Sequence, residues 1–381
     1  MRLAYVVNNA AFFVSHRLPI AEEMLKRGHS VALFVGRAGS DELESQATEK
    51  LSASTIAFHR ASFKGSGLNP FSELVGFVDL LLAIHRFDPD IMHCVSPKGV
   101  LYGAFAAKLL KVPGVVLAIS GMGHLFTSKS KSNVFNSSFR IMYKHMLSYF
   151  IRSSSVRVIV QNHDDQDFIH KLGCSNERIN LIPGSGVNLD LYENADLCGK
   201  ENVVLFPARL LADKGIFEYI TAASNLKKKF PNWRFLIAGA ADYDNPSAVT
   251  RDEIRLICDD SDLEWLGHVS DMPSLYMRAN IVCLPSYREG MPKALLEAAA
   301  AYCAVVTTNV TGCREAVIDK ITGDLVTVKN AIELEICLEN LIKDEARREQ
   351  YGRNARLEAE KRFSIDSVVD KTIGIYGAFR M

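Results

Sequence analysis

Runs of β-branched and other apolar residues alternate with amphipathic stretches along most of this 381-residue chain. Helical patterns such as PIAEEMLKRG and PFSELVGFVDLLLAIHRF separate the runs of the first half. Near-continuous apolar strands separated by helices are typical of a parallel sheet that is covered on both faces. The pattern predicts a doubly wound α/β domain, whose strands we expect at residues 3–8, 30–36, 54–59, 90–96, 115–120 and 157–162.

The alternation then restarts. A second set of strands is expected at residues 202–207, 233–239, 263–267, 280–285 and 304–308. The stretch between the two sets, LIPGSGVNLDLYENADLCGKEN, contains a proline and three glycines and has little periodicity, as an interdomain connection would.

We therefore expect an α/β protein of two Rossmann-like domains that face each other across a cleft. The first domain would span residues 1–182 and the second residues 183–362, with a helix at about 363–381 that packs back on the first domain. In such sheets ligands bind outside the carboxyl ends of the strands.

Several classes of protein are disfavoured by the composition and by absent motifs. The eight cysteines form no C-x-x-C pair and lie mostly in apolar stretches, which favours free thiols in a reducing cytosol over a zinc site or disulfides. The N-terminus lacks the apolar core of a signal peptide, and no run of about 18 apolar residues predicts a membrane span. There is no phosphate loop and no H-E-x-x-H motif, and the DPD at 88–90 predicts a turn. We expect no metal and no cofactor.

The stretch YREGMPKALLE follows the apolar run NIVCLP, so it predicts a loop that enters a helix at the carboxyl end of a strand. Pro292 suits the first helical position, which places Glu289 just before the helix N-terminus. Free N–H groups at that terminus and the helix dipole favour an anion, and Gly290 lets a ligand approach the main chain. The N–H groups that we expect to point outward are those of Met291, Lys293 and Ala294.

Glu297 lies about two turns further along the same helix, among alanines. A carboxylate on such a closely packed face needs a partner, and sugar hydroxyls could donate hydrogen bonds to it. An ordinary structural alternative is that Glu289 caps the helix and Glu297 pairs with Lys293.

A second loop, in NVVLFPARLLADKGIFEYI, carries Arg209 and Lys214 at the carboxyl end of its strand. Two cations at this position could neutralise a diphosphate, although a pair of solvated surface cations would show the same pattern. Together the two loops supply cations, a helix N-terminus and carboxylates that bind hydroxyls. That set matches a nucleotide diphosphate that bears a sugar.

Four separated elements, RLLADKG, WLGHVSDMPSLYMRANIVCLPS, YREGMPKALLEAAA and TTNVTGCREAVIDKITGDLV, carry a family resemblance. In order and spacing they resemble the donor-binding domain of retaining GT-B glycosyltransferases of family 4. The segments VVNNAAFFVSHRLPIAEEMLKRGHSV and GMGHLF of the first half are similar to the bacterial branch that builds lipid-linked oligosaccharides, O-antigen and capsule.

The resemblance implies a role for each element of the second half. Glu289 would contact the hydroxyls of the donor sugar, and Glu297 would hold the ribose hydroxyls. Arg209 and Lys214 would stabilise the diphosphate leaving group. The chain departs from the family pattern where a proline and a lysine replace the more usual apolar residues after the glycine. The donor-binding main chain and the loop that faces the base would comprise Gly290, Met291, Pro292, Lys293, Ala294, Leu295, His268 and Val269.

The first half offers candidates for the acceptor side. His124, in SGMGHLFTS, would lie near the reacting centre as in many relatives, or would be a structural histidine that bonds to a loop carbonyl. Asn9, His16 and Arg17 follow the first strand, where the acceptor loop of the family lies. A cap for the helix after Pro19 is an equally ordinary role for this segment.

The charge of the chain is balanced overall but is unevenly distributed. No Asp or Glu occurs from Ile91 to His163, and FNSSFRIMYKHMLSYFIRSSSVR mixes aromatic residues with cations at helical spacing. Interfacial helices have this composition, and anionic lipid adds about 1 kcal/mol per nearby basic side chain. A buried helix with cations at its rim is the alternative, and no nucleic-acid module is visible. The basic residues of the segment are Lys98, Lys108, Lys111, Lys129, Lys131, Arg140, Lys144, Arg152 and Arg157.

The predicted activity is metal-independent transfer of a sugar, an N-acetylhexosamine or hexose, from a UDP-sugar with retention of anomeric configuration. The acceptor would be a hydroxyl of a polyprenyl-diphosphate-linked saccharide at the cytoplasmic face of the cell membrane, where the protein would be peripheral. Two alternatives are a UDP-sugar epimerase of the same architecture and a nucleotide-sugar-binding module without catalysis.

Overall fold

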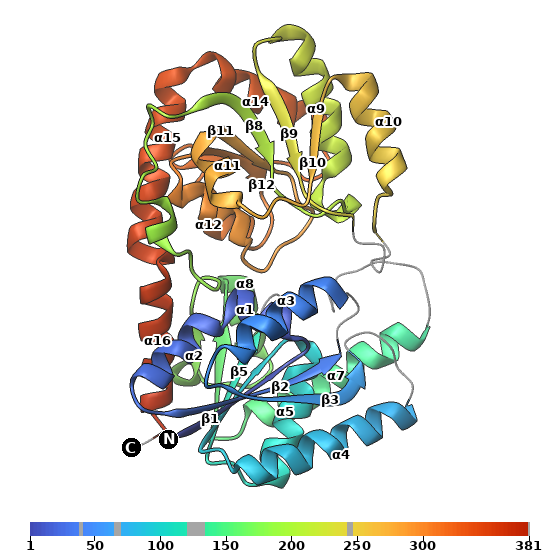
Figure 1. The fold of residues 1–381 in the computed structure, drawn as a ribbon, viewed down its shortest axis with the longest axis vertical. Coiled ribbons are helices and arrows are strands. Elements are labelled where there is room, and N and C mark those ends of the chain that lie inside the picture. Colours follow the sequence, from blue (N-terminus) through green and yellow to red (C-terminus); the bar gives the residue numbers. More distant parts are fainter. Residues whose placement is uncertain (38–40, 65–69, 120–133, 242–246, 380–381) are drawn as a thin grey trace. The chain divides into compact units, whose positions relative to one another are not determined.

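The computed structural model describes residues 1–37, 41–64, 70–119, 134–241 and 247–379. The chain divides into two compact units, one formed by Met1–Ser185 with Val368–Met381 and the other by Gly186–Ser367. The sequence analysis placed these boundaries at 182/183 and about 363. Each unit holds one parallel β-sheet with helices on both faces, as Rossmann-like domains do (Figure 1).

The sheet of the first unit has seven parallel strands in the order β3-β2-β1-β4-β5-β6-β7. The chain order therefore reverses between β1 and β4, whose residues are buried on both faces except at the start of β1. The strands are β1 (Arg2–Val7), β2 (Ser30–Arg37), β3 (Ala57–Lys64), β4 (Ile91–Val95), β5 (Gly114–Ile119), β6 (Val156–Val160) and β7 (Ile179–Leu181).

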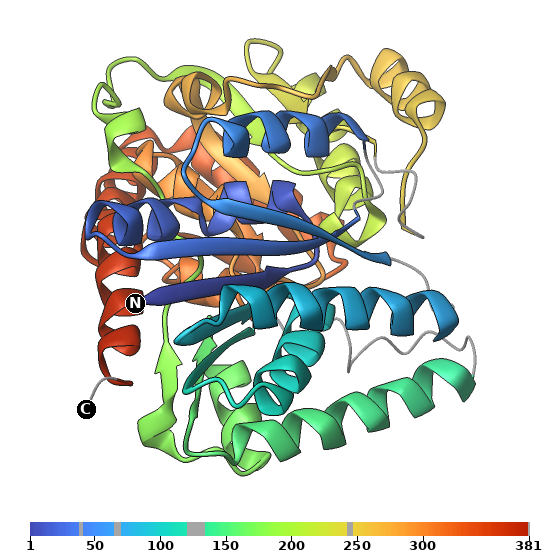
Figure 2. The same cartoon turned by 60° about the horizontal axis from the view of Figure 1, so that its bottom comes forward.

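Helices of the first unit cover both faces of this sheet (Figure 2). Helices α4, α5 and α7 lie side by side on one face, because each connects a strand to the next one in the chain, which lies further along the sheet in the same direction. The helices are α1 (Ala10–His16), α2 (Leu18–Lys26), α3 (Asp41–Ser52), α4 (Pro70–Phe87), α5 (Pro97–Leu109), α7 (Val134–Ile151), α8 (His163–Lys171) and α16 (Ile365–Gly377).

The sheet of the second unit has six parallel strands in the order β10-β9-β8-β11-β12-β13. Its order reverses between β8 and β11, which lie at the centre. The strands are β8 (Glu201–Phe206), β9 (Arg234–Ala238), β10 (Glu264–Gly267), β11 (Ala279–Leu284), β12 (Ala304–Thr308) and β13 (Gly323–Val326). The helices are α9 (Ile216–Lys229), α10 (Arg251–Ser261), α11 (Met272–Arg278), α12 (Lys293–Ala300), α13 (Cys313–Ala316), α14 (Ala331–Lys343) and α15 (Glu345–Glu358).

The fold class predicted from the apolar runs is confirmed, and the strand bounds differ in places. The third strand begins at Ala57 instead of residue 54, because residues 53–55 form a turn after α3. The short edge strands β7 and β13 were not predicted. All eight cysteines are free and six of them are buried. Among the described residues, no helix is both long enough and apolar enough to cross a bilayer.

Candidate functional site

The two loops that the sequence singles out follow β8 and β11, the neighbouring central strands of the second unit. One loop runs from Pro207 to Gly215 and enters α9, and the other runs from Pro285 to Pro292 and enters α12. Because the strand order reverses between β8 and β11, both loops leave the sheet at its topological switch point. This is the place where open α/β sheets bind ligands.

A backbone hydrogen bond and a close backbone contact join these two loops. The N–H of Tyr287 donates to the carbonyl oxygen of Asp213 at 2.9 Å. Gly215 has a left-handed backbone with φ of +75°, and a Cβ atom built on it would lie 2.1 Å from the carbonyl oxygen of Pro285. Only glycine meets both demands, so the close approach of the two loops depends on it.

The loops bring two of the predicted site residues into contact. Lys214 Nζ donates to Glu289 Oε1 at 2.5 Å, and the hydroxyl of Ser286 donates to the same oxygen at 2.8 Å. Both charged side chains are mostly buried, with 22% of Lys214 and 12% of Glu289 exposed. Glu289 is therefore held by two donors. It does not cap α12, so the structural alternative is wrong for this residue.

The N-terminus of α12 lies directly after this pair. The helix begins at Lys293, so Pro292 is the residue before the helix and not its first residue. No described side chain caps this end, while the N–H of Leu295 already bonds to the Pro292 carbonyl at 3.0 Å. Leu295 is buried, and Met291 and Ala294 pack against the same core. The first N–H groups of α12 thus form a terminus suited to an anion.

The segment after β12 packs against the backbone of Gly290. Gly312 has φ of +81°, and a Cβ atom on it would lie 2.5 Å from the carbonyl oxygen of Gly290 and 2.7 Å from that of Glu289. The hydroxyl of Thr308, at the end of β12, donates to the carbonyl oxygen of Ser286. The loop that carries Glu289 is therefore held by Thr308 at Ser286 and by Gly312 at Gly290.

Glu297 lies further along α12, and its side chain is also mostly buried. Burial raises the pKa of its carboxyl, while the ammonium of Lys293 and the hydroxyl of Tyr276 act in the opposite direction. Lys293 Nζ lies 3.6 Å from Glu297 Oε1, so the pairing proposed as the structural alternative is present. The pair leaves Glu297 with capacity to accept further hydrogen bonds, because a carboxylate has about four acceptor sites.

The remaining candidates of the second unit lie at the ends of neighbouring strands. Arg209 has an exposed side chain in the loop after β8. His268 is exposed and follows β10, whereas Val269 packs against the core. The sheet order β10-β9-β8-β11 therefore places these residues along the same sheet edge as Lys214 and Glu289.

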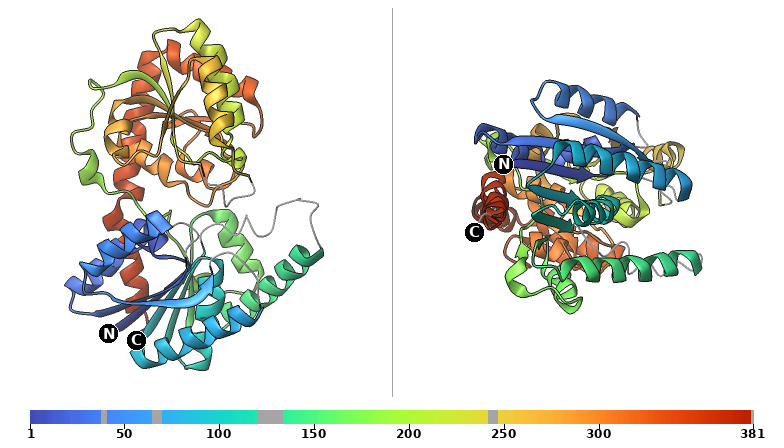
Figure 3. Two further views of the ribbon diagram at one scale, coloured as in Figure 1. Left: turned by 45° about the vertical axis from the view of Figure 1, so that its right-hand side comes forward. Right: turned by 90° about the horizontal axis from the view of Figure 1, so that it is seen from below.

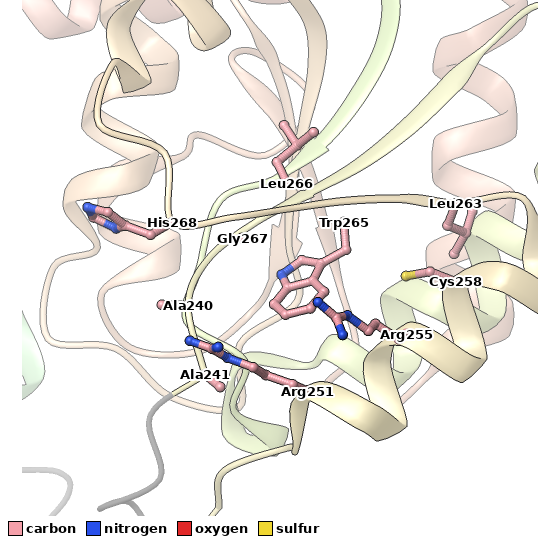
Figure 4. Close-up of a pocket in the computed structure, with 10 residues that line it drawn as sticks. All are labelled: Ala240, Ala241, Arg251, Arg255, Cys258, Leu263, Trp265, Leu266, Gly267 and His268. Carbon is pink, nitrogen blue, oxygen red and sulfur yellow. The ribbon is translucent and has the colours of Figure 1, made fainter.

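A pocket of about 420 Å³ opens at the ends of β9 and β10. Figure 4 shows Arg251 and Arg255 reaching from α10, Arg255 toward Trp265 and Arg251 toward Ala241, with His268 on the far side of the pocket from α10. The indole N–H of Trp265 donates to the Gly239 carbonyl at 2.9 Å, which fixes the ring. The lining residues are Ala240, Ala241, Arg251, Arg255, Cys258, Leu263, Trp265, Leu266, Gly267 and His268.

The candidates of the first unit lie after β1. Asn9 caps α1, because its side chain accepts from the N–H of Phe12 at 2.8 Å. The ring of His16 stacks on Phe12 with centroids 4.2 Å apart. Arg17 is only 4% exposed and donates to the His16 carbonyl at 2.9 Å, so the structure buries it at the end of α1. His124 lies outside the described residues.

Sequence reasoning did not find Ser286 and Tyr287. Ser286 donates to Glu289, and Tyr287 donates to Glu218 on α9 at 2.7 Å. Both lie between β11 and Glu289. This position could have marked them as residues that support the loop of Glu289. Across the described residues, no group of three or more His, Cys, Asp and Glu side chains is arranged to hold a metal ion.

Comparison with known proteins identifies the family. The model described as glycosyl transferases group 1 matches residues 193–358, and the model described as glycosyl transferase 4-like matches residues 2–161. The chain belongs to the GT-B glycosyltransferases. The Lys214–Glu289 contact lies in the half matched by the group 1 model, and the acceptor-side candidates Asn9, His16 and Arg17 lie in the other half.

Individual relatives agree with this family. This glycosyltransferase is 28% identical over 377 residues to N,N'-diacetylbacillosaminyl-diphospho-undecaprenol alpha-1,3-N-acetylgalactosaminyltransferase of Campylobacter jejuni, covering 94% of each chain. It is 25% identical over 318 residues to UDP-Gal:alpha-D-GlcNAc-diphosphoundecaprenol alpha-1,3-galactosyltransferase of Escherichia coli, covering 80% of this chain and 79% of the relative. Its fold matches Anabaena HepE, solved with UDP-glucose, at a TM-score of 0.77 and 18% identity, covering 99% of this chain and all of that one.

Proposed function

We propose that this glycosyltransferase moves a sugar, an N-acetylhexosamine or hexose, from a UDP-sugar to a hydroxyl of a polyprenyl-diphosphate-linked saccharide, with retained anomeric configuration. The observation that carries the proposal is the contact between Lys214 and Glu289 beside the uncapped N-terminus of α12. In the structure these two charges pair with each other. A bound diphosphate would replace Glu289 as the partner of Lys214 and leave the carboxylate to accept hydrogen bonds from sugar hydroxyls.

The same geometry supports a role in the chemical step. As the bond between the anomeric carbon and the UDP oxygen breaks, negative charge develops on the diphosphate. Lys214, Arg209 and the N–H groups at the start of α12 would stabilise that charge without a metal ion. The acceptor oxygen would attack from the face that the diphosphate leaves, and its proton would pass to the departing phosphate oxygen. No nucleophile from the protein is needed in this scheme.

The pocket at the ends of β9 and β10 supports the placement of the nucleoside. It is lined by Gly267 and His268, and it lies along the sheet edge from the loop that holds Lys214. We assign it to the base, with the backbone at His268 and Val269 facing the ring. Glu297 would accept from the ribose hydroxyls, because it is the further carboxylate on the helix that begins at the diphosphate site.

The names of the relatives support the acceptor class. The Campylobacter jejuni and Escherichia coli relatives are both named for undecaprenol-diphosphate-linked saccharides, and the second is also named for a UDP-Gal donor. For the acceptor side of this chain we propose Asn9, His16, Arg17 and His124. We propose that the protein works as a peripheral protein at the cytoplasmic membrane face, attracted by its basic first half.

The test is an assay of UDP release with a panel of UDP-sugars, in the presence and absence of a polyprenyl-diphosphate-linked saccharide. We expect release only with both substrates, and a saccharide product that is one sugar longer. Conversion of one UDP-sugar into another without an acceptor would show an epimerase. Binding of UDP-sugars with no release of UDP under any condition would show a binding module, and either result would contradict the proposal.

A further inference from the structure

Helix α4 of the first unit has an apolar stripe on its outward side as well as on its inner side. Inward, Leu80 and Ile84 are fully buried in the core of the unit. The stripe is formed by residues at helical spacing that are between 46% and 78% exposed: Phe71, Leu74, Val75, Val78 and Leu82. Scattered apolar residues are normal on a protein surface, but five on one face of one helix mark a contact surface.

Both carboxylates of this helix are paired. Glu73 accepts from Lys98 Nζ at 3.0 Å and from the hydroxyl of Tyr102, so it is held against α5. Asp79 lies 3.3 Å from the imidazole of His59 on β3. The acids of α4 are thus engaged by neighbouring elements of the same unit, and Arg86 near the end of the helix is exposed.

Cations from the next helices flank the stripe. Helices α4, α5 and α7 lie in this order over one face of the sheet (Figures 2 and 3). Exposed Lys108 and Lys111 stand at the end of α5, and exposed Lys144 and Arg152 lie on and just after α7. Helix α7 also exposes Ile141, Met142 and Tyr149, and the ammonium of Lys108 lies 3.9 Å from the centroid of the Tyr149 ring.

After Asp90 the chain has no acidic residue until it reaches α8. The segment from Ile91 to His163 has none, and Asp164, Asp165 and Asp167 then follow on α8. The surface formed by α4, α5 and α7 therefore combines an apolar stripe with positive charge that the paired Glu73 and Asp79 offset only in part. That is the composition of surfaces that lie in the interface of an anionic bilayer, with apolar residues at the acyl boundary and cations at the headgroups.

We propose that the outward side of α4, with the basic ends of α5 and α7, docks on an anionic phospholipid bilayer and inserts Phe71, Leu74 and Val78 into its interface. A second copy of the chain fits this surface less well, because two such basic surfaces would repel each other across a symmetric contact. The inference deepens the proposed function, since a bilayer would hold the polyprenyl-linked acceptor.

The test is sedimentation of the full chain with vesicles of mixed phosphatidylethanolamine and phosphatidylglycerol, without donor or acceptor. We expect binding that weakens with added salt and is slight on phosphatidylcholine vesicles. The Leu74→Ser/Val78→Ser variant should bind about tenfold more weakly, because two exposed aliphatic side chains no longer enter the interface. Phe71→Ser should weaken binding as well. The matched control is Ile332→Ser/Ile336→Ser on α14, which removes two exposed apolar residues at the same spacing from the second unit.

The outcomes separate the occupants of the surface. Equal binding by wild type and the Leu74→Ser/Val78→Ser variant would overturn the proposal, as would equal losses in that variant and in the α14 control. Light scattering that shows a dimer which the same variant dissociates would assign the stripe to a second copy and would also overturn it. Because the assay contains neither substrate, its result does not depend on whether the proposed transfer takes place.

Discussion

Lys214 and Glu289 pair with each other, and this pairing explains how two charges can lie at the end of a buried sheet. Each is mostly covered, so neither could remain there alone without a cost of several kcal/mol. In the site we propose, a phosphate oxygen and a sugar hydroxyl would replace the two partners at once. Substrate binding would then exchange one set of hydrogen bonds for another.

The first prediction concerns Glu289. Glu289→Gln keeps the size of the side chain but removes the charge that orients Lys214 and that would bind sugar hydroxyls. We expect turnover to fall by about 100-fold or more, as for the loss of one group that stabilises a transition state. UDP release under saturating substrates measures it.

The matched control is Glu335→Gln. Glu335 on α14 also accepts from a lysine, Lys229, at 2.9 Å, but it belongs to a surface ion pair. Turnover should remain close to wild type there. Equal turnover in the Glu289 and Glu335 variants would remove Glu289 from the site.

The second prediction concerns Glu297, whose pKa is raised by burial. Between the ordinary and the raised pKa, Glu297 keeps its proton in the folded chain and releases it in the unfolded chain. The free energy of unfolding therefore falls as the pH rises through this window. Glu297→Gln should therefore be more stable than wild type at about pH 7.5, and the difference should shrink toward about pH 4. Thermal unfolding at both pH values measures this.

The same variant should bind UDP about tenfold more weakly, because an amide replaces the carboxylate that accepts from the ribose. A gain in stability together with a loss of affinity is typical of a residue kept for binding. Unchanged UDP affinity would contradict the ribose assignment.

Local sequence was sufficient to place the candidate residues at strand ends but not to find their partners. The pattern of strand, loop and helix around Glu289 spans only a few residues, so it could be read directly. The contact with Lys214 joins residues far apart in the chain, and it depends on the order of β8 and β11 in the sheet. Arg17 follows the first strand as expected, but its burial at the end of α1 could not be predicted from the local sequence.

At the level of elements, Gly215 and Gly312 determine how closely three loops approach. The third prediction is that Gly215→Ala and Gly312→Ala each destabilise the protein by about 1–3 kcal/mol, because each places a Cβ in a left-handed backbone against a neighbouring carbonyl oxygen. UDP affinity should fall together with stability, because Gly215 lies in the loop of Lys214 and Gly312 contacts the loop of Glu289. Denaturant unfolding and UDP titration measure the two effects.

Gly374→Ala is the control for these variants. This glycine lies in α16, and a Cβ atom on it would have no neighbour within 4 Å. Alanine should stabilise the helix there by about 0.5–1 kcal/mol. A loss of stability at Gly374 as large as at Gly215 would show that the close approach of the loops is not the cause.

The strands that the sequence analysis missed or misplaced are those whose pattern is weakest. β3, which was expected three residues too early, reads AFHRASFK, in which polar residues interrupt the apolar ones, and it lies at an edge of the sheet. β7 and β13 are edge strands of three and four residues. Central strands are recognised because both faces are buried, whereas an edge strand owes its conformation to pairing that the sequence does not reveal.

At the level of the whole molecule, the chain leaves its first unit after β7 and returns to it in α16. The returning helix is joined to the first sheet by a buried network, in which the hydroxyl of Tyr376 lies 2.5 Å from Nδ1 of His93 and 3.1 Å from the hydroxyl of Tyr5. All three side chains are fully buried. The C-terminal segment is thus part of the core of the first unit.

The fourth prediction follows from this network. Tyr376→Phe should destabilise the protein by about 1–3 kcal/mol, because it leaves His93 and Tyr5 with unsatisfied buried groups. Tyr192→Phe is the matched control, because the Tyr192 hydroxyl is buried and has no hydrogen-bond partner among the described residues. It should be neutral or stabilising. Equal losses in the two variants, measured by denaturant unfolding, would show that the network contributes nothing.

In our proposal, the loops after β8 and β11 form a site for a nucleoside diphosphate. Calorimetric titration of UDP into wild type and Lys214→Met tests it most directly, with Lys229→Met as a control for the loss of a paired surface lysine. We expect UDP to bind wild type and the control alike, and Lys214→Met to lose at least about tenfold in affinity. No binding of UDP to wild type, or the same affinity in all three proteins, would contradict it.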